Sequence, residues 1–307
     1  MTARSGLTLR PIPGSPLDGE TDGPAWDGRA WLVARPAASE IAKWSPATGE
    51  VARFRHSTSG NRGLAVGPDG RCYGAQTASR RIVWYAPDGS TFLLNPMLDG
   101  RRHNDPQDLA IDANGHIWFS DDWTAESGGG PVGWPPLDHR SILRLRRIGD
   151  TEDGIGEWAL ERMTRDTTAP RGVALSPDEA TLYVTDLGDA ATPPTLRAYP
   201  ITPTGLGPVR LVATFGAGRD VVSGIPAGRP GGLAVAAEGR LFVTIRSEAG
   251  PGGIVELAPD GALVACHDVL GSPTNCAIGG PDRSTLIVTT VSGDVLEATL
   301  PDRPGAP

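Results

Sequence analysis

One short pattern recurs along the chain and constrains the fold more than any other feature. At residues 61–73 a polar entry is followed by a short apolar strand, a Pro-Asp-Gly turn and a second strand. Proline presets φ for a turn, aspartate bonds its own backbone, and glycine accepts positive φ, so the triplet predicts a tight reversal. Further copies of this hairpin lie at residues 106–115, 170–179, 230–239 and 274–282, with a degenerate first copy at 22–28.

Six copies of one hairpin predict a closed array of similar units, so we expect a single domain over residues 1–307. The 41 glycines and 29 prolines agree with many turns and short strands, and no long helix is expected. We therefore predict an all-β fold, a six-bladed β-propeller. The sixth repeat has no outer strand of its own, and we expect residues 7–12 to supply it and close the ring, which removes an exposed sheet edge.

Charge and cysteine content exclude several classes of function. The net charge is −8 and there is no basic run, which argues against nucleic acid or an anionic membrane as partner. No apolar segment has the length of a signal peptide or membrane helix. The three cysteines, Cys72, Cys266 and Cys276, form no CxxC pair and lie in or beside apolar strands. We expect buried free thiols and a cytoplasmic protein that binds a small molecule.

One long insertion interrupts the repeats. Residues 121–140 separate the second and third strands of blade 3 and are rich in Gly, Pro and Trp. A loop of this length in a compact domain is usually functional or mobile. A disordered surface excursion is the alternative, but Trp123 and Trp134 favour a lid that contacts substrate, since disordered segments rarely carry tryptophan.

The propeller geometry predicts where the chemistry lies. The residue just before each inner strand should sit at the mouth of the central channel, and the six copies place one ring there: Asp22, Arg62, Gln107, Arg171, Gly231 and Asn275. Polar residues at such positions can simply form turns. Arginine has no turn-forming tendency, however, and a buried guanidinium requires a carboxylate or an anionic ligand.

The ends of the second strands predict a second ring at the same mouth, because adjacent strands are antiparallel. Its members are Arg35, Gln76, Asp121, Asp186, Ile245 with Arg246 beside it, and Thr290. Asp121 and Asp186 are candidate general bases if burial raises their pKa, and turn caps otherwise. Arg246, Thr290 and His103 are candidate substrate contacts, although a loop position is the alternative for His103. The sequence has no nucleophile elbow, metal-binding His pair or phosphate loop.

From about residue 19 to residue 300 the chain resembles the gluconolactonase and senescence-marker-protein (regucalcin) family of six-bladed propellers. The most specific segments are residues 106–112, 170–178 and 273–282. The resemblance implies a lactonase or related esterase with one divalent cation at the channel mouth. It also implies the ligands: Glu before the first inner strand, Asn before the fourth and Asp before the fifth, with an Asn before the third contacting substrate or a metal-bound water.

The chain departs from this pattern at every one of those positions, which hold Asp22, Arg171, Gly231 and Gln107. A hard cation prefers six or more oxygen ligands, and a guanidinium at contact distance would repel it. We therefore predict that the cation is lost and that no cofactor replaces it. Our hypothesis is that Arg171 takes its place, pairs with Asp22 and polarises a carbonyl or stabilises an oxyanion.

Three functions remain open at this stage. The first is a metal-independent enzyme of lactonase ancestry that hydrolyses or opens a lactone or ester. The second is a cyclase, isomerase or lyase of specialised metabolism, with Asp22, Arg171, Asp121 and Asp186 as its catalytic groups. The third is a non-catalytic binding propeller. Substrate contacts in either enzyme would come from Arg62, Gln107, Asn275, Arg246, Thr290, His103, Trp123 and Trp134.

Overall fold

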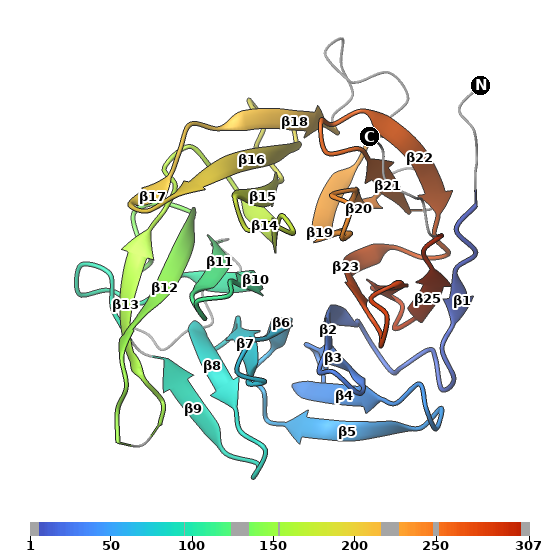
Figure 1. The fold of residues 1–307 in the computed structure, drawn as a ribbon, viewed down its shortest axis with the longest axis horizontal. Coiled ribbons are helices and arrows are strands. Elements are labelled where there is room, and N and C mark those ends of the chain that lie inside the picture. The colour runs from blue at the N-terminus through green and yellow to red at the C-terminus, as the bar shows by residue number, and fades with distance from the viewer. Residues whose placement is uncertain are drawn as a thin grey trace.

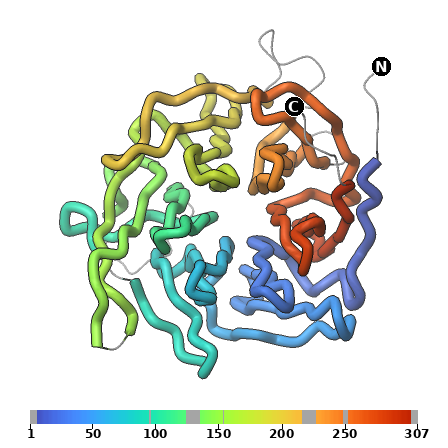
Figure 2. The backbone as a smooth tube through the Cα atoms, in the orientation of Figure 1, coloured from blue at the N-terminus to red at the C-terminus, as the bar shows by residue number. Residues whose placement is uncertain are grey.

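Six antiparallel sheets are arranged around a central axis in the computed structural model (Figure 1). It describes residues 6–94, 96–123, 135–152, 154–215, 227–247 and 252–301. The chain visits the sheets in sequence order, once around the ring (Figure 2). The predicted six-bladed propeller is thus confirmed. The described residues form no helix, and so none long and apolar enough to cross a membrane.

The first three blades each contain four strands in sequence order from the axis to the rim. Blade 1 comprises β2 (Asp22–Trp26), β3 (Trp31–Arg35), β4 (Glu40–Trp44) and β5 (Val51–His56). Blade 2 comprises β6 (Asn61–Val66), β7 (Cys72–Gln76), β8 (Arg81–Tyr85) and β9 (Thr91–Leu94). Blade 3 comprises β10 (Asp105–Ile111), β11 (Ile117–Asp122), β12 (Ser141–Gly149) and β13 (Glu157–Arg162).

The last three blades follow the same plan with two variations. Blade 4 comprises β14 (Pro170–Leu175), β15 (Thr181–Asp186), β16 (Thr195–Thr202), β18 (Arg210–Thr214) and the short β17 (Gly205–Leu206). Blade 5 comprises β19 (Arg229–Val235), β20 (Leu241–Arg246), β21 (Gly253–Leu257) and β22 (Leu263–Asp268). Blade 6 comprises β23 (Pro273–Gly279), β24 (Thr285–Thr290), β25 (Val295–Thr299) and, from the other end of the chain, β1 (Arg10–Pro11).

The N-terminal segment closes the ring as predicted, although its strand is only two residues long. Arg10 pairs with Glu297 and Pro11 with Leu296, and the Ile12 amide donates to the Val295 carbonyl at 3.0 Å. The Ile12 side chain is buried in an apolar cluster that includes Trp31 and Val33 of blade 1 as well as Val295 of blade 6. Closure therefore depends on packing between the first and last blades as much as on strand pairing.

Each of the six inner strands carries a β-bulge at the same point near its start. Two residues of the inner strand lie opposite one residue of the second strand, for example Gln107 and Asp108 opposite Ser120. The bulged pairs are 23–24, 62–63, 107–108, 171–172, 231–232 and 274–275. A bulge bends its strand and redirects side chains. In this propeller it directs consecutive residues of each inner strand toward the channel mouth.

Hydroxyl groups opposite the bulges of blades 3 to 6 bond the irregular backbone. Thr185 accepts from the Gly172 amide at 2.7 Å and donates to the Gly231 carbonyl of the next blade at 2.6 Å. Ser120 likewise accepts from the Asp108 amide and donates to the Arg171 carbonyl. These bonds fix the mouth of one blade against the next, because they satisfy polar groups that the bulge takes out of the strand pairing.

The closure can be tested with Ile12→Ala. Removing a buried isoleucine side chain and leaving a cavity should lower the free energy of unfolding by about 2–5 kcal/mol in urea denaturation. The matched control is Ile148→Ala on β12, where the side chain is 46% exposed and the cost should be about 0.5 kcal/mol or less. Equal losses in the two variants would show that this contact does not hold the ring closed.

Candidate active site

A cavity of about 80 Å³ lies where the six bulged strand starts converge. It is lined by all six residues that the sequence predicts for the first ring: Asp22, Arg62, Gln107, Arg171, Gly231 and Asn275. Asp108, Arg229, Arg246 and Thr274 are among its other lining residues. The structure therefore brings together residues from every blade, with four arginines and two aspartates among them.

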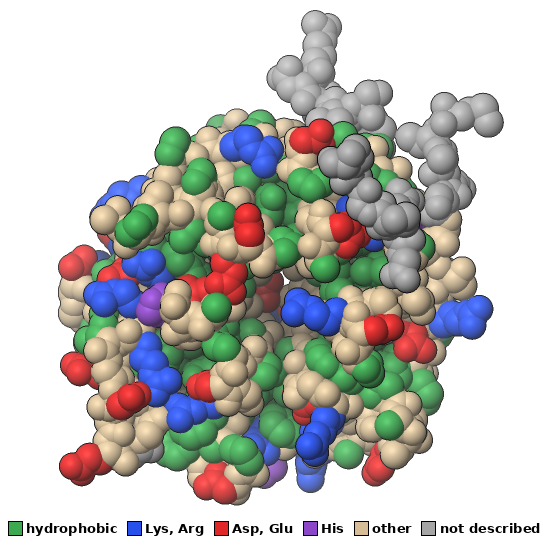
Figure 3. Space-filling model, viewed as in Figure 1, with side chains coloured by type: hydrophobic (Ala, Val, Ile, Leu, Met, Phe, Trp, Pro, Cys, Tyr) green, Lys and Arg blue, Asp and Glu red, His purple; other side chains and the backbone are tan. Residues whose placement is uncertain are grey.

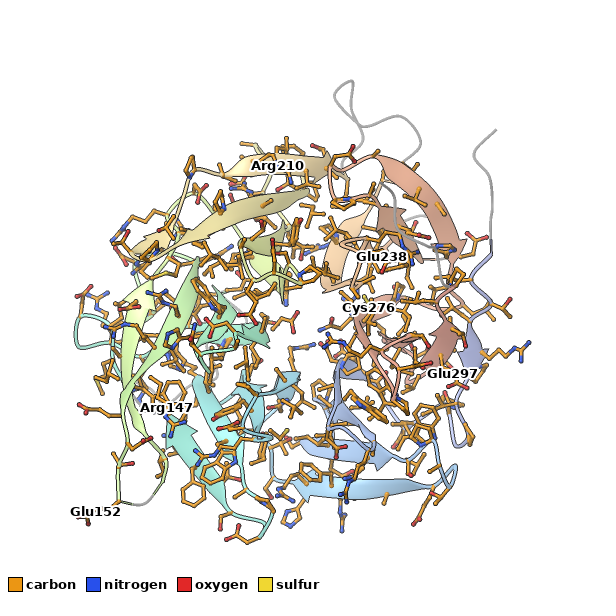
Figure 4. The ribbon with its side chains drawn as sticks, viewed as in Figure 1. Arg147, Glu152, Arg210, Glu238, Cys276 and Glu297 are labelled. Atoms are coloured by element: carbon orange, nitrogen blue, oxygen red, sulfur yellow. The ribbon has the colours of Figure 1, made fainter. Side chains whose placement is uncertain are left out.

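A second cavity of about 170 Å³ lies on the other side of Asp108 and Asn275, which line both. It is bordered mainly by apolar residues of the inner strands. Cys276, one of its residues, lies near the centre of the ring in Figure 4, whereas Arg147, Arg210 and Glu297 lie toward the rim. The space-filling view is hollowed at the centre of the ring, with acidic and basic side chains around the hollow (Figure 3). Asp108 and Asn275 thus divide the channel into a charged and an apolar compartment.

The six first-ring residues do not share one register, which corrects the predicted alignment. Arg62, Gln107, Arg171 and Gly231 each occupy the first bulge position of their strand. Asp22 lies one residue before its bulge, at the paired position, and Asn275 is the second residue of its bulge. Asn275 is consequently equivalent to Asp108, and its amide Nδ2 donates to Asp108 Oδ1 at 3.3 Å.

Asp108 is the functional residue that the ring alignment missed. Its carboxylate accepts from the Val173 amide at 3.2 Å as well as from Asn275, and only 9% of the residue is exposed. No arginine of the described chain lies within ion-pairing distance. Burial, followed by the charge of Asp22, raises the pKa of Asp108 to about 7. The signal in the sequence was an aspartate following Gln107 at the start of an inner strand.

The central space that Asp108 and Asn275 occupy is left by glycines at the same bulge position. A Cβ added to Gly63 would lie 2.7 Å from the Asp108 Cα, and one added to Gly232 would overlap the Asn275 side chain. Side chains at all six of these positions would not fit around the axis. The glycines at the second bulge positions of blades 2, 4 and 5 therefore leave the middle of the channel to the carboxyl of Asp108 and the amide of Asn275.

Asp22 pairs with Arg62 and not with Arg171, the partner predicted from the sequence. Arg62 Nη1 lies 3.0 Å from Asp22 Oδ2 and 3.2 Å from Glu20 Oε1. Burial lowers the pKa of Arg62, but Asp22 and Glu20 together outweigh that effect and raise it. The difference arises because Arg62 projects from the neighbouring blade, directly beside Asp22, while Arg171 comes from blade 4 on the far side of the ring.

Arg171 has a neutral partner instead. Its Nη1 donates to Gln107 Oε1 at 2.5 Å, and its Nε lies 3.8 Å from a carboxylate oxygen of Asp122. Burial lowers the pKa of Arg171, with the nearby Arg62 and Arg246 acting in the same direction and Asp122 and Asp22 opposing them. A guanidinium held on one edge by an amide keeps other N–H groups for a ligand.

The second-ring candidates Asp121, Asp186 and Thr290 bond backbone amides of nearby loops and do not line the cavity. Asp186 accepts the backbone amides of Thr168 and Ala169, each at 2.8 Å, and Asp121 accepts the Asn104 amide at 2.7 Å. Thr290 accepts the Asp294 amide at 2.8 Å. Side chains alternate between the two faces of a strand, so the inward position belongs to the residue before each of these. Those residues are the hydroxyls that bond the bulges. Burial raises the pKa of Asp121 well above its ordinary value, but it does not line the cavity.

Of the remaining candidates within the described residues, all but one lie outside the cavity lining. Arg35 pairs with Glu40, and Gln76 donates to the Tyr85 hydroxyl. His103 is 2% exposed, packs edge-on against Phe119 and has its pKa lowered to about 3 by burial. Trp123 is half-buried near Arg140, and Trp134, like most of the predicted lid, lies outside the described residues. The exception is Arg246, which lines the cavity beside Arg229, a residue that the sequence analysis missed.

The residues at the mouth do not fit the divalent cation that the family resemblance implies. Asp22 is bound by Arg62, and Arg171 directs a guanidinium into the cavity. At Gly231 a Cβ would lie 2.3 Å from the Thr274 carbonyl oxygen, so a carboxylate ligand has no room there without a backbone shift. No group of three or more His, Cys, Asp or Glu side chains placed to hold a metal occurs in the described parts of the chain.

A larger cavity at the rim, about 440 Å³, lacks comparable chemistry. Its ionisable groups include Glu256 and His267, which are buried and bond each other at 2.9 Å, and Glu256 also pairs with Arg240 at 2.5 Å. Groups satisfied in this way hold the outer strands of blade 5 together. We therefore place the candidate active site at the channel mouth.

The buried carboxyl of Asp108 should make stability depend on pH. Its folded-state pKa is raised, so the native state binds the proton more tightly than the unfolded chain, and this destabilising effect grows as pH rises from about 4 to about 7. We expect Asp108→Asn to become more stable relative to wild type over that range, by a few kcal/mol in all. Urea unfolding at pH 4, 5.5, 7 and 8 measures the difference.

The control for this experiment is Asp282→Asn, in an exposed turn. Hydrogen bonds from Ser284 lower the pKa of Asp282, so its contribution has the opposite sign and is lost as pH falls. A stability difference between Asp108→Asn and wild type that stays constant with pH would contradict a raised pKa at Asp108.

Comparisons with known proteins agree with the observed fold. A curated gluconolactonase from Zymomonas mobilis is 28% identical over 293 residues, covering 87% of this chain and 75% of the relative. The structure of a gluconolactonase from Xanthomonas campestris superposes with a TM-score of 0.78 at 26% identity, covering 95% and 89% of the two chains. The calcium-binding protein regucalcin from Agrobacterium tumefaciens, at 19% identity and a TM-score of 0.71 over 98% and 97% of the chains, shares the fold. The model of the SMP-30/gluconolactonase/LRE-like region matches residues 21–292, and the chain belongs to this family.

Proposed function

We propose that the protein is a hydrolase that opens a lactone, or cleaves a comparable ester, at the channel mouth without a metal cofactor. The observation that carries this proposal is the convergence of the Arg171 guanidinium and the Asp108 carboxyl on one cavity that lacks the family's cation ligands. The choice of a lactone rests on the two gluconolactonases to which the chain is similar.

Arg171 is the group that would replace the cation electrostatically. A lactone carbonyl placed in the cavity would accept from the guanidinium N–H groups that Gln107 does not occupy. Negative charge develops on this oxygen as the carbonyl is attacked, and a fixed cationic donor stabilises it more than it stabilises the neutral ester. Gln107 holds the guanidinium in one orientation, so that little reorganisation is needed during the reaction.

Asp108 is the group that would activate water. Its carboxylate takes one proton as the water oxygen bonds to the carbonyl carbon, and the carbonyl electrons move to the oxygen bound by Arg171. When the tetrahedral intermediate collapses, the ring C–O bond breaks and the departing ring oxygen takes the proton back from Asp108. The product is the open-chain hydroxy acid. A base with a pKa of about 7 suits both transfers at neutral pH, whereas Asp22 is bound by Arg62.

The size of the cavity agrees with this assignment. A volume of about 80 Å³ accommodates two or three water-sized groups, enough for the reacting carbonyl and the attacking water. The remainder of the ligand would extend from the mouth. The apolar compartment beyond Asp108 and Asn275 is not needed for the reaction.

The role of Arg171 is tested with a panel of γ- and δ-lactones in the presence and absence of a chelator. We expect turnover that chelation leaves unchanged, and a fall in kcat/KM of about 10²–10³ in Arg171→Gln, as for removal of one oxyanion donor. Arg210→Gln, on the exposed rim of blade 4, is the matched control and should retain wild-type activity. Loss of activity on chelation would overturn metal independence. If no lactone is hydrolysed, the predicted cyclase, isomerase or lyase role and the non-catalytic role become the better hypotheses.

The role of Asp108 is tested by the pH dependence of the rate. Because the base acts only when ionised, kcat/KM should rise with pH through about 7 and level off above it. Asp108→Asn should lower the rate by at least about 10², since general-base assistance is lost, and should abolish the rise. A variant that kept the wild-type pH profile at a lower rate would assign the base to another group.

A further inference from the structure

Two arginines of blade 5 lie directly opposite each other at the mouth. Arg229 begins β19, Arg246 ends β20, and the two are register partners in this antiparallel pair. Both line the mouth cavity. Like charges directly opposite each other on adjacent strands destabilise a sheet. Arg229 is exposed and the Arg246 side chain is 40% exposed, so water screens the pair in part, and an anion bound between the two guanidinium groups would stabilise them further.

The described residues supply only part of that compensation. Arg246 Nη2 lies 3.3 Å from Glu20 Oε1, but the same oxygen lies 3.2 Å from Arg62 Nη1, so one carboxylate serves two guanidinium groups. Arg229 forms no ion pair with any residue in the described ranges. The side of the mouth formed by blade 5 therefore carries positive charge that Glu20 does not neutralise.

We infer that the ligand carries a carboxylate in addition to its reacting carbonyl, and that Arg229 and Arg246 bind this group. This inference rests on the proposed function for the identity of the reacting group, but the anion site itself is read from blade 5. Each guanidinium group offers a planar set of N–H donors, which matches a carboxylate better than a point charge would. The preferred substrate class is thus an acidic lactone, and the product is a dicarboxylate.

The arrangement also separates the two ends of such a ligand. Arg171 of blade 4 faces the reacting carbonyl, whereas Arg229 and Arg246 of blade 5 face the permanent carboxylate. Binding energy gained at the second point orients the first. The two arginines of blade 5 are specificity-determining residues, distinct from the residues proposed to carry out the reaction.

Binding can be measured without turnover, using unreactive probes. Isothermal titration calorimetry at low ionic strength would compare succinate, glutarate and adipate with the monocarboxylates of the same chain lengths. We expect at least one dicarboxylate to bind 10-fold or more tightly than its monocarboxylate partner, and this preference to fall as salt is raised. In the double variant Arg229→Gln, Arg246→Gln the preference should shrink to 3-fold or less, while Arg210→Gln should keep it.

A melting measurement and one further variant show whether the protein remains folded and whether the effect on binding is direct. The double glutamine variant removes a like-charge pair, so its melting temperature at low salt should equal or exceed that of wild type. Glu20→Gln removes the carboxylate that competes for Arg246, and it should strengthen dicarboxylate binding. No preference for any dicarboxylate, or a preference that survives in the double variant, would overturn the inference.

Activity measurements separate this inference from the proposed reaction. D-Glucaro-1,4-lactone carries a free carboxylate and D-glucono-1,4-lactone does not. The double variant should lower kcat/KM for the acidic lactone by 10-fold or more and change that for the neutral lactone by 3-fold or less. Dicarboxylate binding without hydrolysis of any lactone would overturn the reaction and leave the anion site standing. Hydrolysis without any preference for the acidic lactone or for dicarboxylates would overturn the anion site and leave the proposed reaction standing.

Discussion

The mouth of this propeller is organised by the burial of one carboxyl group on the axis where six strands meet. Asp108 extends from blade 3 across the channel to an amide of blade 4 and the Asn275 side chain of blade 6. Gly63, at the equivalent bulge position of blade 2, leaves the space that Asp108 requires, and Gly232 of blade 5 leaves the space that Asn275 requires. Burial, followed by the charge of Asp22, raises the pKa of this carboxyl to about 7, and the amide donors that hold it lower the pKa only in part. The carboxyl that bonds blades 4 and 6 from blade 3 is therefore also the group in the cavity whose pKa best suits it to accept a proton.

The arginines around Asp108 show how a charged cavity can be assembled without neutralising every group. Arg62 is held by two carboxylates, Arg171 chiefly by an amide, and Arg229 by none of the described residues. The negative charge that surrounds each of these arginines thus decreases from the side of the mouth formed by blades 1 and 2 toward blades 4 and 5. The guanidinium groups with the fewest protein partners keep N–H donors that a ligand can use. The number of protein partners therefore separates arginines with a structural role from arginines available to bind a ligand.

The repeats and turns made the propeller, its blade order and its closing strand predictable, because Pro-Asp-Gly turns and short apolar runs are local signals. The details of the site were less accessible. A bulge places two residues opposite one, so the alignment of Asp22 and Asn275 with Arg62 slipped by a residue in each direction. The second-ring predictions failed because side chains alternate between the two faces of a strand. Asp121 and Asp186 bond amides of nearby loops, whereas Ser120 and Thr185 bond the bulged inner strands. The partner of Asp22 depended on which blade lies adjacent, which composition does not reveal.

The substitutions at the family's ligand positions are best understood together, as a change that conserves charge. The resemblance implies a dication balanced by a Glu and an Asp, with a neutral Asn, so that the site sums to zero. In this chain Asp22 contributes one negative charge, Arg171 one positive charge, and Gly231 none, which again sums to zero. Replacing only the Asn by Arg would leave excess positive charge beside a dication, and replacing only the Asp by Gly would leave the dication undercompensated. A Cβ at Gly231 would lie 2.3 Å from the Thr274 carbonyl oxygen, so an aspartate there would require a backbone shift, and this substitution alone would not create a metal site.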